Sequence, residues 1–137
     1  MQEAQNTKVV QDAYAAFGRG DIPAVLNLLD ENVTWKPVTG AADYVPTAGE
    51  RHGKAGVKEF FKILGESVQF ERFEPREFVA QDDKVVALGR YTGKTPGGRT
   101  FESEWVMIFT LRGGKVVTFQ EFADSAALNA AYQPATV

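Results

Sequence analysis

One carboxylate stands out in the stretch Lys115–Ala123, where Glu121 follows Val117 and Phe119 at intervals of two residues. Side chains alternate between the two faces of a strand, so the spacing predicts that these three residues share one face. Both faces of this strand carry apolar residues, and a carboxylate buried there is costly unless it is paired, hydrogen-bonded or protonated. Glu121 is therefore the best candidate for a general acid or base, because apolar surroundings raise the pKa of a carboxyl group and suit it to abstract a proton beside a carbonyl.

Two further polar residues are candidates for the same chemistry. Arg90 falls on the predicted pocket-facing register of an earlier strand, together with Val86 and Leu88. It would either stabilise an enolate-like oxygen or form a structural ion pair that keeps Glu121 charged and less basic. His52 is the only histidine and precedes a predicted helix, where it would either transfer a proton near neutral pH or fix the turn between loop and helix.

Aromatic and amphipathic side chains are the candidates for binding a substrate. Most inward-facing aromatic residues belong to a core, but Trp35 and Trp105 carry an indole N–H that needs a partner, which favours a position beside a cavity. The other candidates share a strand face with Trp105 or with Glu121, lie on the first helix or stand in a long loop. The predicted substrate-binding residues are Tyr14, Trp35, Tyr44, Ser103, Trp105, Met107 and Phe119.

Composition limits the classes of function. The 137 residues suit one domain, and 44% hydrophobic with 24% charged residues are ordinary globular values. A net charge of −3 with scattered lysines and arginines argues against nucleic-acid binding. The lack of cysteine excludes disulfides and thiol catalysis, and with one histidine it argues against a metal site. No signal-like segment or membrane-length apolar run is present. We therefore expect a single cytoplasmic domain, residues 1–137, that needs no metal or organic cofactor.

The elements that must position these residues follow from the pattern of apolar residues. Helical spacing predicts helices over Asn6–Gly18 and Lys54–Ser67, and Asp21 is a suitable N-cap for a short helix between them. A strand over Val33–Val38 and a loop over Thr39–Arg51 follow that short helix. The loop is long enough to be a lid or a binding loop.

The second half of the chain changes to strand-like patterns separated by turn residues, and a short helix follows them. The predicted strands are Val68–Ala80, Lys84–Lys94, Thr100–Arg112 and Lys115–Ala123, and the closing helix is Ser125–Tyr132. Three helices followed by a mostly antiparallel meander indicate an α+β architecture. Long strands twist and coil, so the sheet is expected to be curved and to enclose a pocket on its concave side.

Four stretches carry a resemblance to a known family: Phe17–Asp21, Leu28–Trp35, His52–Phe61 and Gly114–Leu128. In this order they resemble the SnoaL-like group, which is related to ketosteroid isomerase and limonene epoxide hydrolase within the nuclear-transport-factor-like superfamily. The resemblance covers nearly the whole chain. It implies the cystatin-like cone fold, in which three N-terminal helices pack in the concave face of the curved sheet. This fold carries many unrelated activities, so the function has to be argued from the site.

Residue by residue, the resemblance supports only part of the site. The acid/base aspartate of the SnoaL cyclase lies on the late strands, and Glu121 is its nearest equivalent by position. The base of ketosteroid isomerase would fall in Trp35-Lys36-Pro37, which has no carboxylate. Limonene epoxide hydrolase uses two aspartates that flank an arginine. Glu121 occupies the position of one aspartate, Arg90 occupies the position of the other aspartate, and Leu88 occupies the position of the arginine. Its water-activating arrangement is therefore absent.

The sequence thus favours an enzyme of small hydrophobic carbonyl compounds that works by acid/base proton transfer, as an isomerase, a cyclase or a hydrolase. A non-catalytic ligand-binding or accessory protein of the same fold is the alternative. The opposite face of the sheet carries Val106, Ile108 and Phe122, and an exposed apolar face usually marks an interface. With the resemblance, this face predicts a homodimer packed sheet to sheet. We expect no nucleic-acid or membrane partner.

Overall fold

The computed structural model describes residues 2–40 and 42–134. In chain order its elements are α1 (Gln2–Gly18), α2 (Ile22–Asn27), β1 (Leu29–Thr39), β2 (Arg51–His52), α3 (Gly53–Ser67), β3 (Gln69–Gln81), β4 (Lys84–Lys94), β5 (Thr100–Arg112), β6 (Lys115–Ala123) and α4 (Ser125–Tyr132). None of the helices in these two ranges is long and apolar enough to cross a membrane.

The six strands of the described residues form one sheet in the order β2-β1-β6-β5-β4-β3. β3 to β6 pair as the predicted antiparallel meander, whereas β1 pairs with β6 in parallel. β1 begins at Leu29, earlier than predicted, because Leu29 pairs with Val116 of β6 instead of continuing the helix. The short strand β2 lies at the end of the segment predicted as a loop and pairs with Thr34 and Trp35.

Local sequence explains the corners that join these elements. Gly20 adopts a φ of +72°, a left-handed conformation that costs glycine little, and so ends α1. Asp21 caps α2 by accepting a hydrogen bond from the Ala24 N–H at 3.2 Å. Gly113 and Gly114 both have positive φ, as the tight hairpin turn between β5 and β6 requires.

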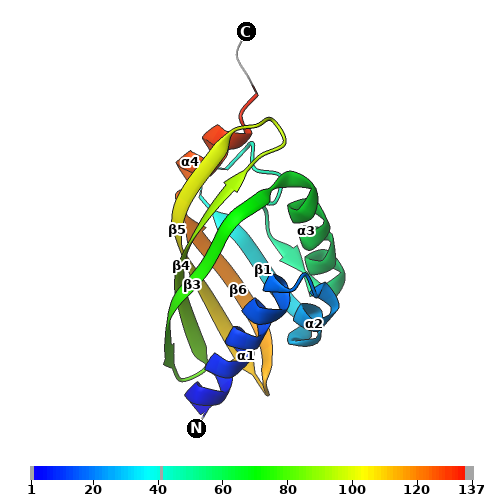
Figure 1. The fold of residues 1–137 in the computed structure, drawn as a ribbon. Coiled ribbons are helices and arrows are strands. Elements are labelled where there is room, and N and C mark those ends of the chain that lie inside the picture. Colours follow the sequence, from blue (N-terminus) through cyan, green and yellow to red (C-terminus); the bar gives the residue numbers. More distant parts are fainter. Residues whose placement is uncertain (1, 41, 135–137) are drawn as a thin grey trace.

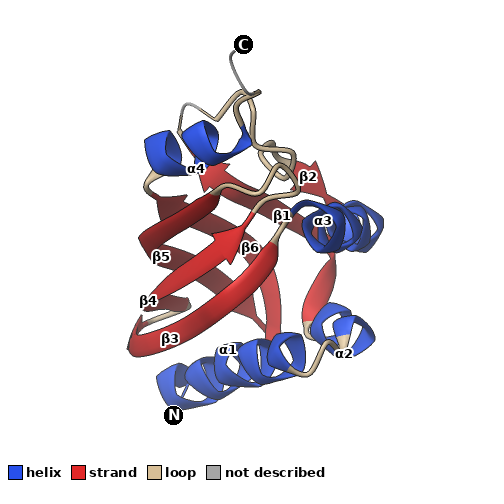
Figure 2. Ribbon diagram, turned by 45° about the horizontal axis from the view of Figure 1, so that its top comes forward, coloured by secondary structure: helices blue, strands red, loops and turns tan. Residues whose placement is uncertain are grey.

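The helices lie along one side of the curved sheet. Figures 1 and 2 show α1, α2 and α3 on the concave side, and α4 at the end of the sheet opposite α1. The hydrophobic core fills the space between these helices and the sheet, with side chains such as Val10, Val57, Val85 and Leu111 almost completely buried. The predicted α+β architecture, with three N-terminal helices against a curved, mostly antiparallel sheet and a short C-terminal helix, is confirmed.

A glycine on β4 allows one tryptophan to lie inside this core. Gly89 pairs with Trp105 across β4 and β5. A Cβ atom at Gly89 would lie 2.3 Å from Cζ2 of Trp105 and 2.5 Å from the carbonyl oxygen of Glu74. The indole therefore packs against bare backbone, and it stacks on the Tyr14 ring of α1 with 5.7 Å between ring centroids. Trp105 fixes α1 to the sheet.

Candidate functional site

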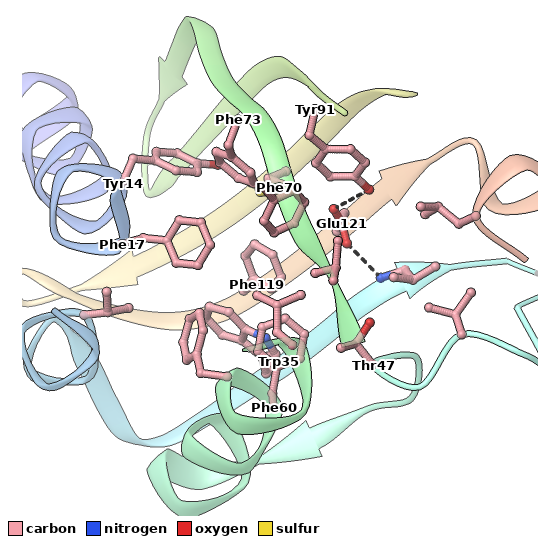
Figure 3. Close-up of a pocket in the computed structure, with 18 of the residues that line it drawn as sticks. Tyr14, Phe17, Trp35, Thr47, Phe60, Phe70, Phe73, Tyr91, Phe119 and Glu121 are labelled. Atoms are coloured by element: carbon pink, nitrogen blue, oxygen red, sulfur yellow. Dashed lines mark hydrogen bonds between the residues drawn. The ribbon is translucent and has the colours of Figure 1, made fainter. Parts of the chain in front are cut away.

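A cavity of about 100 Å³ lies between the helices and the concave face of the sheet. Its lining is largely aromatic, with rings from α1, α3, α4 and five strands, and Figure 3 shows many of them. The aromatic lining residues are Tyr14, Phe17, Trp35, Phe60, Phe61, Phe70, Phe73, Tyr91, Phe101, Phe109, Phe119 and Tyr132. Among the described residues that line the cavity, those that can ionise are its three tyrosines and Glu121.

Glu121 projects from β6 into this apolar space and is only 6% exposed. Its Oε1 accepts a hydrogen bond from the Val38 N–H at 3.1 Å, and its Oε2 accepts one from the Tyr91 hydroxyl at 3.1 Å. Figure 3 shows the carboxylate beside Tyr91 at one side of the cavity, with Tyr14 and Phe17 at the other. None of the salt bridges between described residues involves Glu121. The carboxylate is therefore held by two neutral donors.

The surroundings set the protonation of this group. Burial raises the pKa of Glu121, while the hydrogen bonds from Val38 and Tyr91 favour the charged form and oppose the rise. Burial and the nearby charge of Glu121 also raise the pKa of Tyr91, so this phenol remains a donor. Burial raises the pKa of Tyr14 as well. The result is a carboxyl group that holds a proton to higher pH than a surface glutamate, next to a neutral phenol.

An irregularity in β1 supplies the backbone donor. The pairing between β1 and β6 shifts register between Lys36 and Thr39, and Val38 has a φ of +47°. A β-branched residue rarely adopts this left-handed conformation, which costs about 1–3 kcal/mol. The shift takes the Val38 N–H out of the regular ladder and directs it to Glu121. A second irregularity lies in the pairing of β5 and β6, where Thr110 pairs with Thr118 but Leu111 pairs with Val116, so that Val117 is skipped. Val116 is therefore in the core, and not Val117 as the alternation predicted.

The loop before β2 forms another part of the wall. Val45 and Thr47 of this loop are buried and line the cavity. Arg51 holds the loop in place, because its Nη1 donates to the carbonyl oxygens of Thr47 at 2.6 Å and Gly49 at 2.9 Å. Tyr44 was predicted to bind substrate, but its side chain is 46% exposed and does not line the cavity.

The predicted position of Arg90 is wrong. Arg90 lies on the outer face of β4, where its Nη2 forms an ion pair with Oε1 of Glu102. The cavity side of β4 is formed by the alternate register, in which Val85, Ala87, Gly89 and Tyr91 are buried. Apolar residues occupy both faces of this strand, so their alternation alone favoured the wrong face. An ion pair between Arg90 and Glu121 is therefore not formed.

His52 does not reach the cavity either. Its side chain is 67% exposed, and its Nε2 lies 2.7 Å from Oε2 of Glu50. It precedes α3 at the N-cap position but makes no side-chain capping bond. The placement favours a role in the turn between β2 and α3 over proton transfer in the cavity. Within the described residues, no three His, Asp or Glu side chains gather as a metal site would require.

The remaining predicted binding residues divide into two groups. Tyr14, Trp35, Met107 and Phe119 line the cavity, and their role in binding stays a prediction. Trp105 and Ser103 are buried but do not line it. Trp105 packs against α1, and the Ser103 hydroxyl donates to the Glu104 carbonyl and accepts from the Asp124 N–H.

Sequence reasoning missed Tyr91, the one side chain that donates to Glu121 among the described residues. A signal for it was present. The alternate residues Val85, Ala87 and Gly89 become smaller along the strand and end at Tyr91, a pattern that leaves room for large side chains from elsewhere. The cross-strand partner of Glu121 is Met107 of β5. Tyr91 lies on β4, beyond β5, so its side chain reaches the carboxylate across that strand.

Comparisons with known proteins agree with this architecture. The SnoaL-like domain family matches residues 10–119. An NTF2-like protein from Burkholderia xenovorans LB400 is 35% identical, with a TM-score of 0.86, and the match covers 96% of this chain and 98% of the other. An NTF2-like protein of unknown function from Burkholderia pseudomallei K96243 is 26% identical, with a TM-score of 0.84 and coverage of 95% and 98%.

A third solved structure, TerC co-crystallized with polyporic acid, is 26% identical, with a TM-score of 0.81 and coverage of 95% and 99%. No protein of curated function matches the sequence. The family match spans most of the chain, and the fold and the 35% identical relative agree with it. The chain therefore belongs to the SnoaL-like family of the NTF2-like superfamily.

Proposed function

We propose that this protein is an enzyme of small aromatic or hydrophobic carbonyl compounds, with Glu121 as its general acid/base. The observation that carries the proposal is a buried carboxyl group, without a cationic partner among the described residues, in the wall of an otherwise apolar cavity. A structural glutamate would normally be neutralised by a partner. A carboxyl group with a raised pKa is instead a stronger base than an ordinary glutamate, and so is suited to take up and return a proton.

The size of the cavity limits the substrate. About 100 Å³ is somewhat less than the roughly 150 Å³ of an apolar cavity that accepts benzene. A one-ring compound fits with small adjustments of the side chains, whereas a larger ligand needs the loop before β2 or α4 to move. The relative TerC was co-crystallized with polyporic acid, which supports a small organic molecule as the ligand of this fold.

The chemistry would use both groups of the Glu121–Tyr91 pair. The Glu121 carboxylate takes a proton from the carbon next to the carbonyl group, and the electron pair left behind moves onto the carbonyl oxygen. Once protonated, Glu121 no longer needs the Tyr91 hydroxyl as a donor, so this hydroxyl is free to hydrogen-bond to the enolate oxygen. Return of the proton to a different carbon gives isomerisation. Attack of the enolate carbon on a second carbonyl carbon gives cyclisation, and the alkoxide formed there takes the proton back from Glu121.

Hydrogen–deuterium exchange tests the proton transfer without knowledge of the natural substrate. A panel of aryl ketones with exchangeable α-protons is incubated with the protein in D₂O, and loss of the α-proton signal is followed by NMR. We expect catalysed exchange that is reduced by at least about 100-fold in Glu121→Gln, the range in which general acid/base groups contribute. Glu66→Gln, which changes an exposed glutamate of α3, is the matched control and retains the exchange.

The outcome also decides between the enzyme and its alternative. Ketones that raise the melting temperature but show no catalysed exchange would indicate a ligand-binding protein of the same fold. Exchange that persists in Glu121→Gln would refute the role of Glu121. Folding of each variant is checked first by its circular dichroism spectrum and thermal transition.

A further inference from the structure

Among the described residues, the walls of the cavity hold no positive counterpart to the charge of Glu121. The lining residues of α1, β4 and α4 that can ionise are the phenols Tyr14, Tyr91 and Tyr132. Burial raises the pKa of each, to about 12 for Tyr132, so all three remain neutral near pH 7. The lining residues from α2, α3, β1, β3, β5 and the loop before β2 carry no ionisable group. When Glu121 ionises, its favourable contacts within the described part of the chain are two hydrogen bonds from neutral donors.

Those two hydrogen bonds leave part of the carboxylate free. A carboxylate has about four lone-pair positions, and Val38 and Tyr91 use one on each oxygen. The oxygens lie in the cavity wall, so a bound molecule could donate to the remaining positions. A donor with a positive charge satisfies both the unused positions and the unpaired charge.

The rest of the cavity also favours a cation. Its rings form a continuous wall, with centroid separations of 5.6 Å for Phe70 and Tyr91, 5.3 Å for Phe70 and Phe73, and 5.1 Å for Phe17 and Phe73. The faces of aromatic rings attract an organic cation, and the attraction is strongest where water is excluded. The same rings provide an apolar surface for the remainder of such a ligand.

From this arrangement we infer that the cavity binds small hydrophobic ammonium ions, with the ammonium group on Glu121 and the apolar part among the rings of Phe17, Phe70 and Phe73. A protonated aryl amine with one ring is of suitable size, given a cavity of about 100 Å³. Binding of these ammonium ions does not depend on the proposed proton transfer, because it uses only the negative charge of Glu121. If the ketones are substrates, such amines are competitive inhibitors.

Binding of an ammonium ion should be coupled to the protonation of Glu121. The ligand requires the charged carboxylate, and burial raises the pKa of that group in the free protein. Below this pKa, the bound cation displaces a proton, so affinity increases with pH and approaches a tenfold gain per unit. Above it, the affinity becomes constant and proton release stops.

Benzylamine and benzyl alcohol form a matched pair of probes, because they have nearly the same shape and only the amine is charged. Dissociation constants are measured by isothermal titration calorimetry at pH 6, 7 and 8, in two buffers with different enthalpies of ionisation, which also gives the number of protons released. We expect benzylamine to bind at least about tenfold more tightly than benzyl alcohol at pH 8, because hydrogen bonds to charged groups are the stronger ones. The preference should be lost in Glu121→Gln and retained in Glu66→Gln.

Three results would overturn the inference: no binding of benzylamine, equal affinity for the two probes at every pH, or an amine preference that survives in Glu121→Gln. If Glu121→Gln does not fold, the wild-type preference and the pH dependence of proton release decide the question. Ketone exchange is measured separately. Amine binding without ketone exchange would support this inference and refute the proposed enzyme. Ketone exchange without amine binding would support the proposed enzyme and refute this inference.

Discussion

Replacing Glu121 by glutamine removes one ionisable group and keeps nearly the same shape. The amide oxygen of the new side chain would still accept the Val38 N–H. Because burial raises the pKa of Glu121 above the ordinary 4.5, the folded wild type binds this proton more tightly than the unfolded chain does. The free energy of unfolding of the wild type should therefore fall as the pH rises from about 4.5 through the folded pKa, whereas the variant lacks this contribution.

The size of this effect follows from linkage. One proton contributes a slope of at most about 1.4 kcal/mol per pH unit, so the total change is about 1.4 kcal/mol for each unit by which the pKa is raised. Solvent screening does not reduce it, because the carboxyl group is almost completely buried. The two hydrogen bonds limit the rise in pKa, since both favour the charged form.

The assay is urea denaturation of wild type, Glu121→Gln and Glu66→Gln at half-unit steps from pH 4.5 to 8. The quantity of interest is the free energy of unfolding of Glu121→Gln minus that of the wild type. This difference should increase with pH and then level off above the folded pKa. A difference that is constant over the range, or one that decreases with pH, would show that burial does not raise the pKa and would remove the physical basis of the site.

Three further changes test other parts of the structure. Tyr91→Phe removes a donor to the carboxylate, so the pKa of Glu121 should rise further. The pH range over which stability changes in the urea experiment should then move upward, and an unchanged range would exclude the hydrogen bond between Tyr91 and Glu121. Gly89→Ala should destabilise the fold by about 1–3 kcal/mol in urea denaturation, because the new Cβ overlaps Trp105 and backbone, and a stability equal to wild type would contradict this packing. We also propose the homodimer through the outer sheet face, where Phe122 is 41% exposed. Light scattering should then show a dimer for wild type and a monomer for Phe122→Asp, and a monomeric wild type would refute the interface.

Much of the fold could be predicted from local sequence. The four strands of the meander, β3 to β6, begin and end within one residue of their predicted limits, because they are bounded by turn residues such as Gly113 and Gly114, whose conformations are set locally. The burial of Glu121 could also be predicted, because Phe119 lies two residues before it on the same strand face. The sequence alone therefore determined the class of fold, its family and the residue on which the candidate site depends.

Only the tertiary structure decided what surrounds that residue. β4 has apolar side chains on both faces, so its local pattern does not specify whether Arg90 or Tyr91 enters the cavity. The pairing of β3, β4 and β5 into one curved sheet selects Tyr91. The second donor, Val38, depends on a register shift between β1 and β6, strands separated by most of the chain. Pairings between such distant segments are set by packing of the whole sheet, and they determine that Glu121 is held by two neutral donors instead of a cation.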